Sequence, residues 1–230
     1  MLKIDNYNSQ ILDNISFELN SKNLIILGPN GAGKTTLAKV LSGIIDNTNV
    51  TIDNINPSKV YGTHKTEIIN YIPAKLDIFD EFITVYDFLA LNKLYTKLSI
   101  DEVLEVLDIS HLKNNPCHIL SSGESQLLLI AGAILHSAKY TILDEPTSNL
   151  DPQKIQKVFK LLKDNTLFKN KIIITHNLDL AYKLGFDILF IEDGKIIFND
   201  TNKTFFEDKN LESFFQNSVK KIENNIVVNI

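Results

Sequence analysis

The sequence predicts an α/β fold with a helical insertion. Short apolar runs alternate along the chain with segments of helical periodicity, which is the pattern of an α/β protein. Between residues 76 and 136 the apolar residues recur at helical spacings without strand-like alternation. A chain of 230 residues, 44% of them apolar, is long enough to bury a full core as one large domain or two small ones.

The expected strands follow the apolar runs in chain order. Residues 11–19 alternate between apolar and polar side chains, and several later runs are continuous, as is typical of a buried parallel sheet. Further strands are expected at 23–27, 140–143, 171–174, 188–191 and 195–198. Two last apolar runs flank Asn224 and Asn225, which predicts a small hairpin over 219–230.

The helical insertion is expected over residues 74–136, within a single domain whose core comprises residues 1–73 and 137–230. No repeat or low-complexity linker interrupts the chain. The apolar residues at helical spacing are Val85, Phe88, Leu89, Leu91, Leu94, Val103, Leu104, Val106 and Leu107.

Composition restricts the classes of function. The net charge is −5, from 23 basic and 28 acidic residues, which argues against a disordered tail and against a protein that coats nucleic acid. All 23 basic residues are lysine. A chain without arginine lacks the bidentate fork commonly used on phosphates, so any phosphate chemistry depends on lysine, backbone N–H groups and a metal ion.

The cysteine count and the hydropathy pattern predict a cytoplasmic location. Cys117 is the only cysteine, so neither an internal disulfide nor a cysteine-based zinc site can form. The N-terminus has acidic and amide side chains instead of a basic cluster with an apolar run, so no signal peptide is expected. The most apolar stretch, Leu127 to Leu135, has nine residues, fewer than the roughly 20 that a membrane-spanning helix needs.

The first chemical motif is GPNGAGKTT at residues 28–36, which lies between the apolar run NLIIL and the helix-compatible run TLAKVLSGI. It matches the P-loop pattern G-x-x-x-x-G-K-[ST] in its strand–loop–helix setting. The glycines let consecutive N–H groups point inward and form a nest for phosphate oxygens. Lys34 is expected to bridge the β- and γ-phosphates of ATP, and Thr35 to ligate Mg²⁺. The predicted ATP-binding residues of the loop are Gly28, Pro29, Asn30, Gly31, Ala32, Gly33, Lys34, Thr35 and Thr36.

The second motif is YTILDEPTSNLD at residues 140–151, where an apolar strand ends in two adjacent carboxylates. This is the Walker B arrangement. Asp144 is expected to hold Mg²⁺ through its water shell. Glu145 is expected to polarise the water that attacks the γ-phosphate.

The third motif, LSSGESQ at 120–126, resembles the LSGGQ-type signature of ABC ATPases. Taken alone, this segment is more typical of a capping box at a helix start. Because it follows a P-loop at this distance, the signature interpretation is favoured. The resemblance implies a RecA-like P-loop NTPase core with a mixed sheet, an N-terminal antiparallel β-subdomain and an inserted α-helical subdomain. It also implies that four residues contact the γ-phosphate held by the partner subunit at a helix N-terminus: Ser121, Ser122, Gly123 and Glu124.

The resemblance extends over nearly the whole chain. SNLD at 148–151, which ends in Asp151, looks like the D-loop that couples two ATP sites. IIITHNLDL at 172–180 looks like the switch strand, and implies that His176 contacts the γ-phosphate and holds Glu145 with the attacking water. Tyr7 stands where the family stacks an aromatic ring on adenine; the alternative is an ordinary strand tyrosine.

The chain departs from the family pattern at Ala74. The family places a glutamine there, after a strand that ends Tyr-x-Pro, where it ligates Mg²⁺ and senses the transmembrane partner. Here the segment reads YIPAKLD, so we expect water to replace the missing amide oxygen, and coupling to depend on neighbours such as Lys75, Asp77 and Phe79. The alternative is a catalytically impaired cassette that acts with a fully equipped partner. The helix after the signature also lacks the family's arginines, so we expect it to be more buried than usual or less electrostatically tied to its neighbours.

The resemblance also implies partners. ABC ATPases act as head-to-tail dimers, so a homodimer or a dimer with a close paralogue is expected, together with two transmembrane permease subunits and, indirectly, an exported substrate-binding protein. The expected location is the cytoplasmic face of the inner membrane, and no nucleic acid partner is expected. The signature, the segment 175–196 and the tail resemble ATPases that serve importers of iron-siderophores, haem or cobalamin, which predicts iron transport.

Two alternatives remain open from the sequence. Ala131 and Gly132 are compatible with an energy-coupling-factor type importer of vitamins or metals, although the expected Phe-Gln-Asn segment is missing. The other alternative is a non-transport ABC ATPase that serves iron-sulfur assembly or DNA maintenance.

Overall fold

The computed structural model describes residues 1–20, 22–76, 80–164, 166–216 and 218–228. The predicted coupling residues Asp77 and Phe79, and the last two residues of the predicted hairpin, lie outside these ranges. The chain forms two compact units, one of residues Met1–Val60 with Ile172–Ile230 and the other of residues Tyr61–Lys171. They are called unit 1 and unit 2 below. The division of the core at 74 and 136 remains a prediction.

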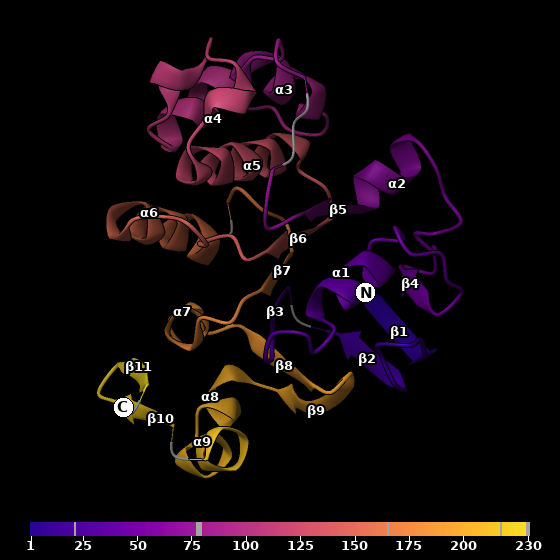
Figure 1. Cartoon of the computed structure of the whole chain (residues 1–230). Helices are drawn as coiled ribbons and strands as arrows, with labels where there is room; N and C mark the ends of the chain where they lie inside the picture. The colour runs from indigo at the N-terminus through magenta and orange to yellow at the C-terminus, as the bar shows by residue number, and fades with distance from the viewer. Residues whose placement is uncertain (21, 77–79, 165, 217, 229–230) are drawn as a thin grey trace. The chain divides into compact units, whose positions relative to one another are not determined.

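Unit 1 contains a three-stranded antiparallel sheet and a mixed sheet (Figure 1). In the first, β1 lies between β2 and β4. In the second, β3 lies between β7 and β8, and β8 pairs with β3 in parallel and with β9 antiparallel. Its elements are β1 (Leu2–Tyr7), β2 (Ile15–Leu19), β3 (Asn23–Leu27), α1 (Lys34–Leu41), β4 (Val50–Ile52), β7 (Lys171–Ile174, whose first residue belongs to unit 2), α7 (Leu178–Leu184), β8 (Asp187–Glu192), β9 (Lys195–Asp200), α8 (Asn202–Phe205), α9 (Asp208–Phe215), β10 (Val219–Ile222) and β11 (Asn225–Val228).

Unit 2 combines a parallel strand pair, β5 with β6, and a group of helices. Its longest helix, α5, contacts both α3 and α4. Its elements are α2 (Thr63–Ile68), β5 (Ile69–Ile72), α3 (Val85–Asn92), α4 (Ile100–Val106), two 3₁₀ turns (Ser110–Leu112 and Cys117–Ile119), α5 (Ser122–His136), β6 (Tyr140–Asp144) and α6 (Pro152–Lys163).

The predicted fold class is confirmed, including the mixed sheet and the antiparallel N-terminal strands. The expected strands at 23–27, 140–143, 171–174, 188–191 and 195–198 all form, and the hairpin pairs Val219 with Val228. The strand expected at 11–19 is shorter, because Ser9 and Leu12 close a turn and Asn14 is left-handed with φ 50°, so β2 begins at Ile15. The sequence analysis did not predict β1 and β4.

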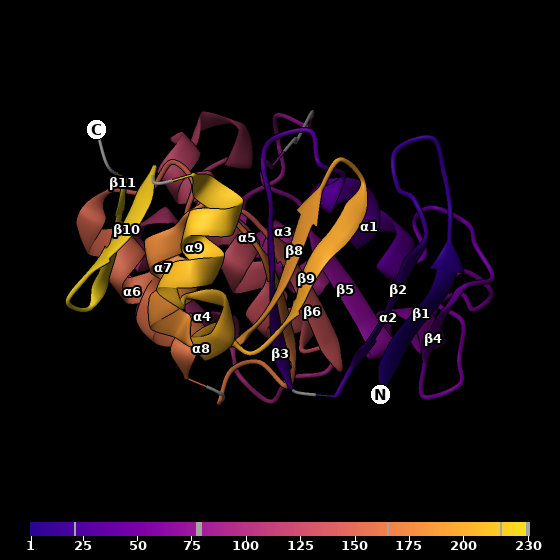
Figure 2. The same cartoon turned by 90° about the horizontal axis from the view of Figure 1, so that it is seen from below.

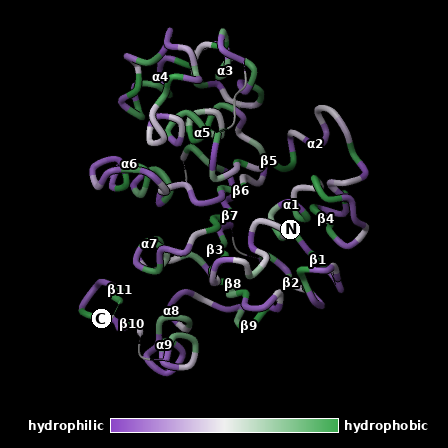
Figure 3. The backbone as a smooth tube through the Cα atoms, viewed as in Figure 1, coloured by the Kyte–Doolittle hydropathy of each residue, from purple (hydrophilic) through white to green (hydrophobic). Residues whose placement is uncertain are grey.

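Helix α5 forms part of the core of unit 2. Its residues from Gln126 to His136 are all buried. The hydropathy colouring shows this helix as largely hydrophobic (Figure 3). Within the described ranges, no helix has both the length and the apolar character needed to cross a membrane.

An aromatic cluster packs α8 and α9 against strands β8 and β9. Figure 2 shows the two helices beside these strands. Phe205 stacks on Phe214 with ring centroids 5.3 Å apart, and both rings also contact Phe190 and Phe198. Such aromatic pairs contribute about 0.5–1.5 kcal/mol each beyond the burial of their area. This cluster anchors the segment after β9 to the mixed sheet.

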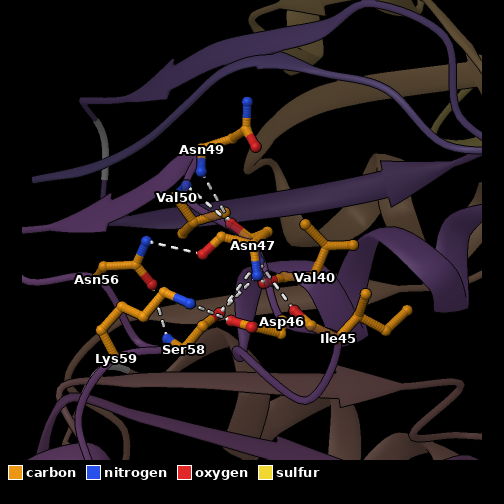
Figure 4. A network of polar contacts seen from close by, with 9 residues as sticks. All are labelled: Val40, Ile45, Asp46, Asn47, Asn49, Val50, Asn56, Ser58 and Lys59. Carbon is orange, nitrogen blue, oxygen red and sulfur yellow. Dashed lines mark hydrogen bonds and ion pairs between the residues drawn. The ribbon is translucent and has the colours of Figure 1, made fainter.

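Asn47 organises the loop that follows α1 (Figure 4). Its buried side-chain amide donates to the carbonyl oxygens of Val40 and Ile45, at 3.1 and 3.0 Å, and its side-chain oxygen accepts from the backbone N–H groups of Asn49 and Val50. Buried polar groups are stable only when hydrogen-bonded, and here one side chain satisfies four backbone groups. The C-terminal end of α1 is thereby fixed to the start of β4.

We expect a pH-dependent stabilisation when Lys171, at the start of β7, is replaced by methionine. Lys171 is fully buried, and burial lowers the pKa of its ammonium from 10.5 to about 8. As pH rises, the folded chain loses this proton near pH 8 and the unfolded chain near pH 10.5. The free energy of unfolding therefore rises with pH between these values, and below pH 8 the buried charge destabilises the folded chain by its full amount. That cost is on the order of 3 kcal/mol, reduced by the loss of the hydrogen bond to the Asp164 carbonyl oxygen.

Thermal melts of Lys171→Met and wild type at pH 7 and pH 9.5 test this expectation. The variant should melt higher at pH 7, and the difference should shrink at pH 9.5. Lys169→Met is the matched control, because Lys169 is an exposed lysine two positions away. A difference between variant and wild type that is the same at both pH values would contradict the assignment.

Candidate nucleotide-binding site

The P-loop of unit 1 has the backbone shape that its glycines predict. Gly28, Gly31 and Gly33 have positive φ angles of 152°, 84° and 98°. A Cβ atom on Gly28 would lie only 2.1 Å from the carbonyl oxygen of Ile191, and one on Gly33 would lie 2.6 Å from a methyl carbon of Leu12. The first and last of these glycines are therefore required both by conformation and by space.

Lys34 is the first residue of α1 and is buried. Its ammonium donates to the carbonyl oxygens of Gly28 and Pro29, at 2.8 Å each, so the side chain folds back over the loop. The N-cap residue of the helix is Gly33, so no capping side chain accepts a hydrogen bond from the N–H groups of the first turn, and this turn has no acidic residue. A helix N-terminus of this kind, with a cation beside it, favours an anionic ligand.

Two further predicted residues belong to unit 1. His176 is exposed, between the end of β7 and the start of α7. It follows Thr175, whose N–H donates to the carbonyl oxygen of Ile26 on β3, so the mixed sheet fixes this segment. Tyr7 ends β1 opposite Ile15 and is 8% exposed, which leaves little of its ring open to a base. The assignment of Tyr7 to adenine stacking remains a prediction.

Strand β6 of unit 2 ends in Asp144, which is 4% exposed. Its Oδ2 accepts a hydrogen bond of 3.1 Å from the hydroxyl of Tyr71 on the neighbouring strand β5. Burial raises the pKa of Tyr71 above its usual range, and the nearby carboxylate raises it further, so the phenol stays protonated and donates. A buried carboxylate with a fixed orientation is suited to binding a hard cation.

The backbone of Glu145 adopts a left-handed conformation, with φ 49°. Its carbonyl oxygen accepts from the side-chain amide of Gln126 at 3.4 Å and from the N–H and hydroxyl of Ser148 at 3.0 and 2.9 Å. A non-glycine residue in this region costs on the order of 1–3 kcal/mol, and such strain is concentrated at functional sites. The chain thus turns sharply after Asp144, and the surrounding hydrogen bonds hold Glu145 there.

The signature segment is a capping box as well as a helix start. Ser121 caps α5: its hydroxyl accepts from the N–H of Glu124 at 3.3 Å, while the Glu124 carboxylate accepts from the N–H of Ser121 at 2.8 Å and from its hydroxyl at 2.7 Å. The bonds from the Ser121 hydroxyl and N–H hold the pKa of Glu124 below its ordinary value. Ser122 is exposed at the first position of the helix.

The signature and the D-loop are in close contact within unit 2. A Cβ atom on Gly123 would lie 3.0 Å from the carbonyl oxygen of Asn149, so a side chain there would press on the D-loop. Asp151 caps α6 through the N–H of Lys154, at 2.9 Å, and pairs with the Lys154 ammonium at 3.1 Å. Of the predicted residues in unit 2, the structure thus brings Gly123 and the D-loop together.

Ala74 lies beside the signature helix. It lines a pocket of about 300 Å³ together with Lys75, Ser122 and Gln126, among other residues of unit 2. Alanine offers no side-chain oxygen to this pocket.

Tyr71 and Gln126 are not identified as site residues by the sequence. Tyr71 belongs to a Tyr-x-Pro strand end, and Gln126 is the last residue of the signature segment. Their roles depend on which atoms they reach, at Asp144 and Glu145. The only signal in the sequence is proximity to a motif.

Comparison with known proteins shows what the chain is similar to. The family model described as ABC transporter matches residues 12–148. An ABC transporter ATP-binding protein of Pyrococcus horikoshii is 32% identical over 198 residues, which cover 82% of this chain and 76% of that protein. The zinc import ATP-binding protein ZnuC of Pasteurella multocida is 35% identical over 174 residues, which cover 74% of this chain and 63% of that protein.

A solved structure of an ABC transporter subunit is also similar to this chain. The chain is similar to cbiO1 from Clostridium perfringens, which is part of the ABC transporter complex cbiONQ, with a TM-score of 0.72 and 27% identity over 94% of this chain and 95% of that one.

Proposed function

Because the chain belongs to the ABC transporter family, whose cassettes hydrolyse ATP, we propose that it is the ATPase subunit of a multi-subunit importer. The observation that carries this proposal is the P-loop, where glycines required by φ and by space surround a helix N-terminus and a buried lysine. Family membership supports the reaction. The geometry supports the assignment of residues to it.

The P-loop residues bind the triphosphate in this proposal. Lys34 exchanges its two carbonyl partners for β- and γ-phosphate oxygens, and the N–H groups of residues 31–36 surround the phosphates. The loop residues from Gly28 to Thr36 are assigned to ATP, His176 to the γ-phosphate, and Tyr7 to the base.

The residues present fit a magnesium ion. Asp144 offers a buried, oriented carboxylate, and Thr35, which follows Lys34 in the P-loop, offers a hydroxyl. When bound, Mg²⁺ neutralises charge on the phosphates of ATP. Where the family glutamine is replaced by Ala74, we assign no protein ligand, since magnesium readily retains water molecules in its shell.

Glu145 acts as the general base in this proposal. Its carboxylate holds a water molecule in line with the γ-phosphate and takes a proton from it as the water oxygen attacks phosphorus. The bond between the γ-phosphorus and the bridging oxygen breaks, and ADP leaves with that oxygen. The hydrogen bonds from Gln126 and Ser148 keep its backbone in the strained turn, so the side chain is directed without reorganisation during the reaction.

The signature acts on a second cassette in this proposal. Ser121, Ser122, Gly123 and Glu124 contact the γ-phosphate bound by the partner, and Asp151 couples the two sites. We propose a homodimer or a dimer with a close paralogue, bound to two permease subunits at the cytoplasmic face of the membrane, with an exported binding protein as an indirect partner.

We propose a metal ion or a metal complex as the imported substrate, with zinc as the first candidate. Five relatives carry the name zinc import ATP-binding protein, among them the protein of Pasteurella multocida. These relatives do not support the prediction of iron transport, because their names specify zinc. A growth assay at limiting zinc, with and without the gene, tests the choice of substrate.

Replacing Lys34 by alanine tests the ATPase assignment. The wild-type chain should bind MgATP and hydrolyse it slowly, whereas Lys34→Ala should bind it at least about tenfold more weakly, as expected when a charged hydrogen bond is lost. Lys39→Ala, which removes an exposed lysine from the same helix, is the matched control and should bind as wild type does. Equilibrium dialysis with radiolabelled ATP measures the affinities. A wild-type chain that shows no MgATP binding at all would overturn the proposal.

A further inference from the structure

Tyr71 reaches Asp144 because of the register between two strands. β5 and β6 run in parallel, with Tyr71 opposite Ile142, and are adjacent in Figure 1. Asp144 lies two residues beyond Ile142, and alternate residues of a strand project to the same face. The ring of Tyr71 spans this diagonal, and its hydroxyl meets Oδ2 of Asp144 at 3.1 Å.

The hydrogen bond acts on a carboxylate that has little contact with water. Asp144 is 4% exposed, so protein groups must replace much of its hydration, and hydrogen bonds to charged groups are the strong ones. A donor on Oδ2 also limits rotation of the carboxylate about its Cβ–Cγ bond. The other residues of β5 cannot replace this donor, since Ile69 and Ile72 are apolar and Asn70 alternates to the opposite face.

We propose that Tyr71 is a positioning residue that orients Asp144 for the magnesium ion of MgATP. This inference rests on the function proposed above. Loss of a group that orients a direct metal ligand typically reduces metal affinity 10- to 100-fold. Asp144 is expected to act through the water shell of the ion, so we place the effect of Tyr71 at the lower end of this range. The contribution matters more in this chain, because Ala74, three residues after Tyr71, has no side-chain oxygen to share the task.

Tyr71→Phe removes the hydroxyl and retains the ring. ATP binding is measured as a function of Mg²⁺ concentration in the full chain, with Glu145→Gln present in every protein so that hydrolysis does not consume ATP. We expect the Mg²⁺ concentration for half-maximal ATP binding to rise about tenfold. Binding of ATP in EDTA should stay within twofold, since the P-loop is intact.

The control is Tyr86→Phe, which removes a hydroxyl from an exposed tyrosine on α3 of the same unit. It should leave the Mg²⁺ dependence unchanged. Thermal melts without nucleotide establish that each variant is folded, and because the chain has seven tyrosines and no tryptophan, tyrosine emission reports the fold directly.

The outcomes separate this inference from the proposed function. An unchanged Mg²⁺ midpoint in Tyr71→Phe overturns the inference, while MgATP binding by the parent protein upholds the function. Equal losses of affinity in EDTA and in Mg²⁺ also overturn it, because they reveal a merely structural role. A parent protein that binds no ATP under either condition contradicts the function itself.

Discussion

Replacing Glu145 by glutamine lowers ATP turnover at least about a hundredfold and leaves ATP binding within a fewfold of wild type. Glutamine has nearly the same shape as glutamate but cannot take a proton from water. The strained backbone should be unaffected, because its hydrogen bonds to Gln126 and Ser148 involve the carbonyl oxygen and not the side chain. The ATP-bound dimer should therefore accumulate, and gel filtration with MgATP should show it.

Glu105→Gln is the matched control for this experiment. Glu105 is an exposed glutamate on α4 and belongs to none of the motifs. The same change of charge at this position should therefore leave the rate of ATP turnover unchanged. A Glu145→Gln protein that hydrolyses ATP at the wild-type rate would show that another group is the general base.

Two inactive variants, mixed in equal amounts, recover activity if the signature acts in trans. Lys34→Ala damages the P-loop, and Ser122→Asp places a negative charge where the partner's γ-phosphate should bind. Ser122 is a better target than Gly123, because it is exposed and an acidic residue in the first helical turn favours α5. By contrast, any side chain at position 123 would press on Asn149.

Random pairing makes half of the dimers mixed. Each mixed dimer has one of its two sites intact, formed by the P-loop of the Ser122→Asp subunit and the signature of the Lys34→Ala subunit. Roughly a quarter of the wild-type number of sites is therefore restored. A mixture that hydrolyses no more ATP than the two variants do separately would count against the arrangement, provided that Ser122→Gly, which restores the family residue, is active.

The parts of the fold that the sequence predicted are those with local signals. β3 and β6 are continuous apolar runs that lead into motifs, and α5 is an apolar helix that begins with a capping box. β1 and β4 escaped prediction because β1 mixes buried and exposed positions irregularly and β4 has three residues. Their stability comes from pairing with each other across some 50 positions of sequence, which no local pattern records.

The residues of the candidate site also fall into two groups: those that local sequence motifs predict and those that only the structure identifies. The P-loop, the Walker B carboxylates and the signature have fixed spacings that can be read along the chain. Tyr71 and Gln126 act on Asp144 and Glu145 through single hydrogen bonds set by strand register and helix packing, so they become apparent only in three dimensions. The role of Tyr7 in adenine stacking stays a prediction from its position in the sequence, and its ring is largely buried in this structure.

The ammonium of Lys34 and the carbonyl oxygens of Gly28 and Pro29 have a kinetic consequence. The lysine holds the P-loop in its curled shape from within. If ATP binds there as proposed, it meets a preformed nest and not a loop that must first fold around it. In the proposed complex, capture requires the Lys34 side chain to move from these carbonyl oxygens to the phosphates, while the loop itself keeps its shape. We therefore expect differences in affinity among nucleotides to arise mainly from the rate at which each one dissociates.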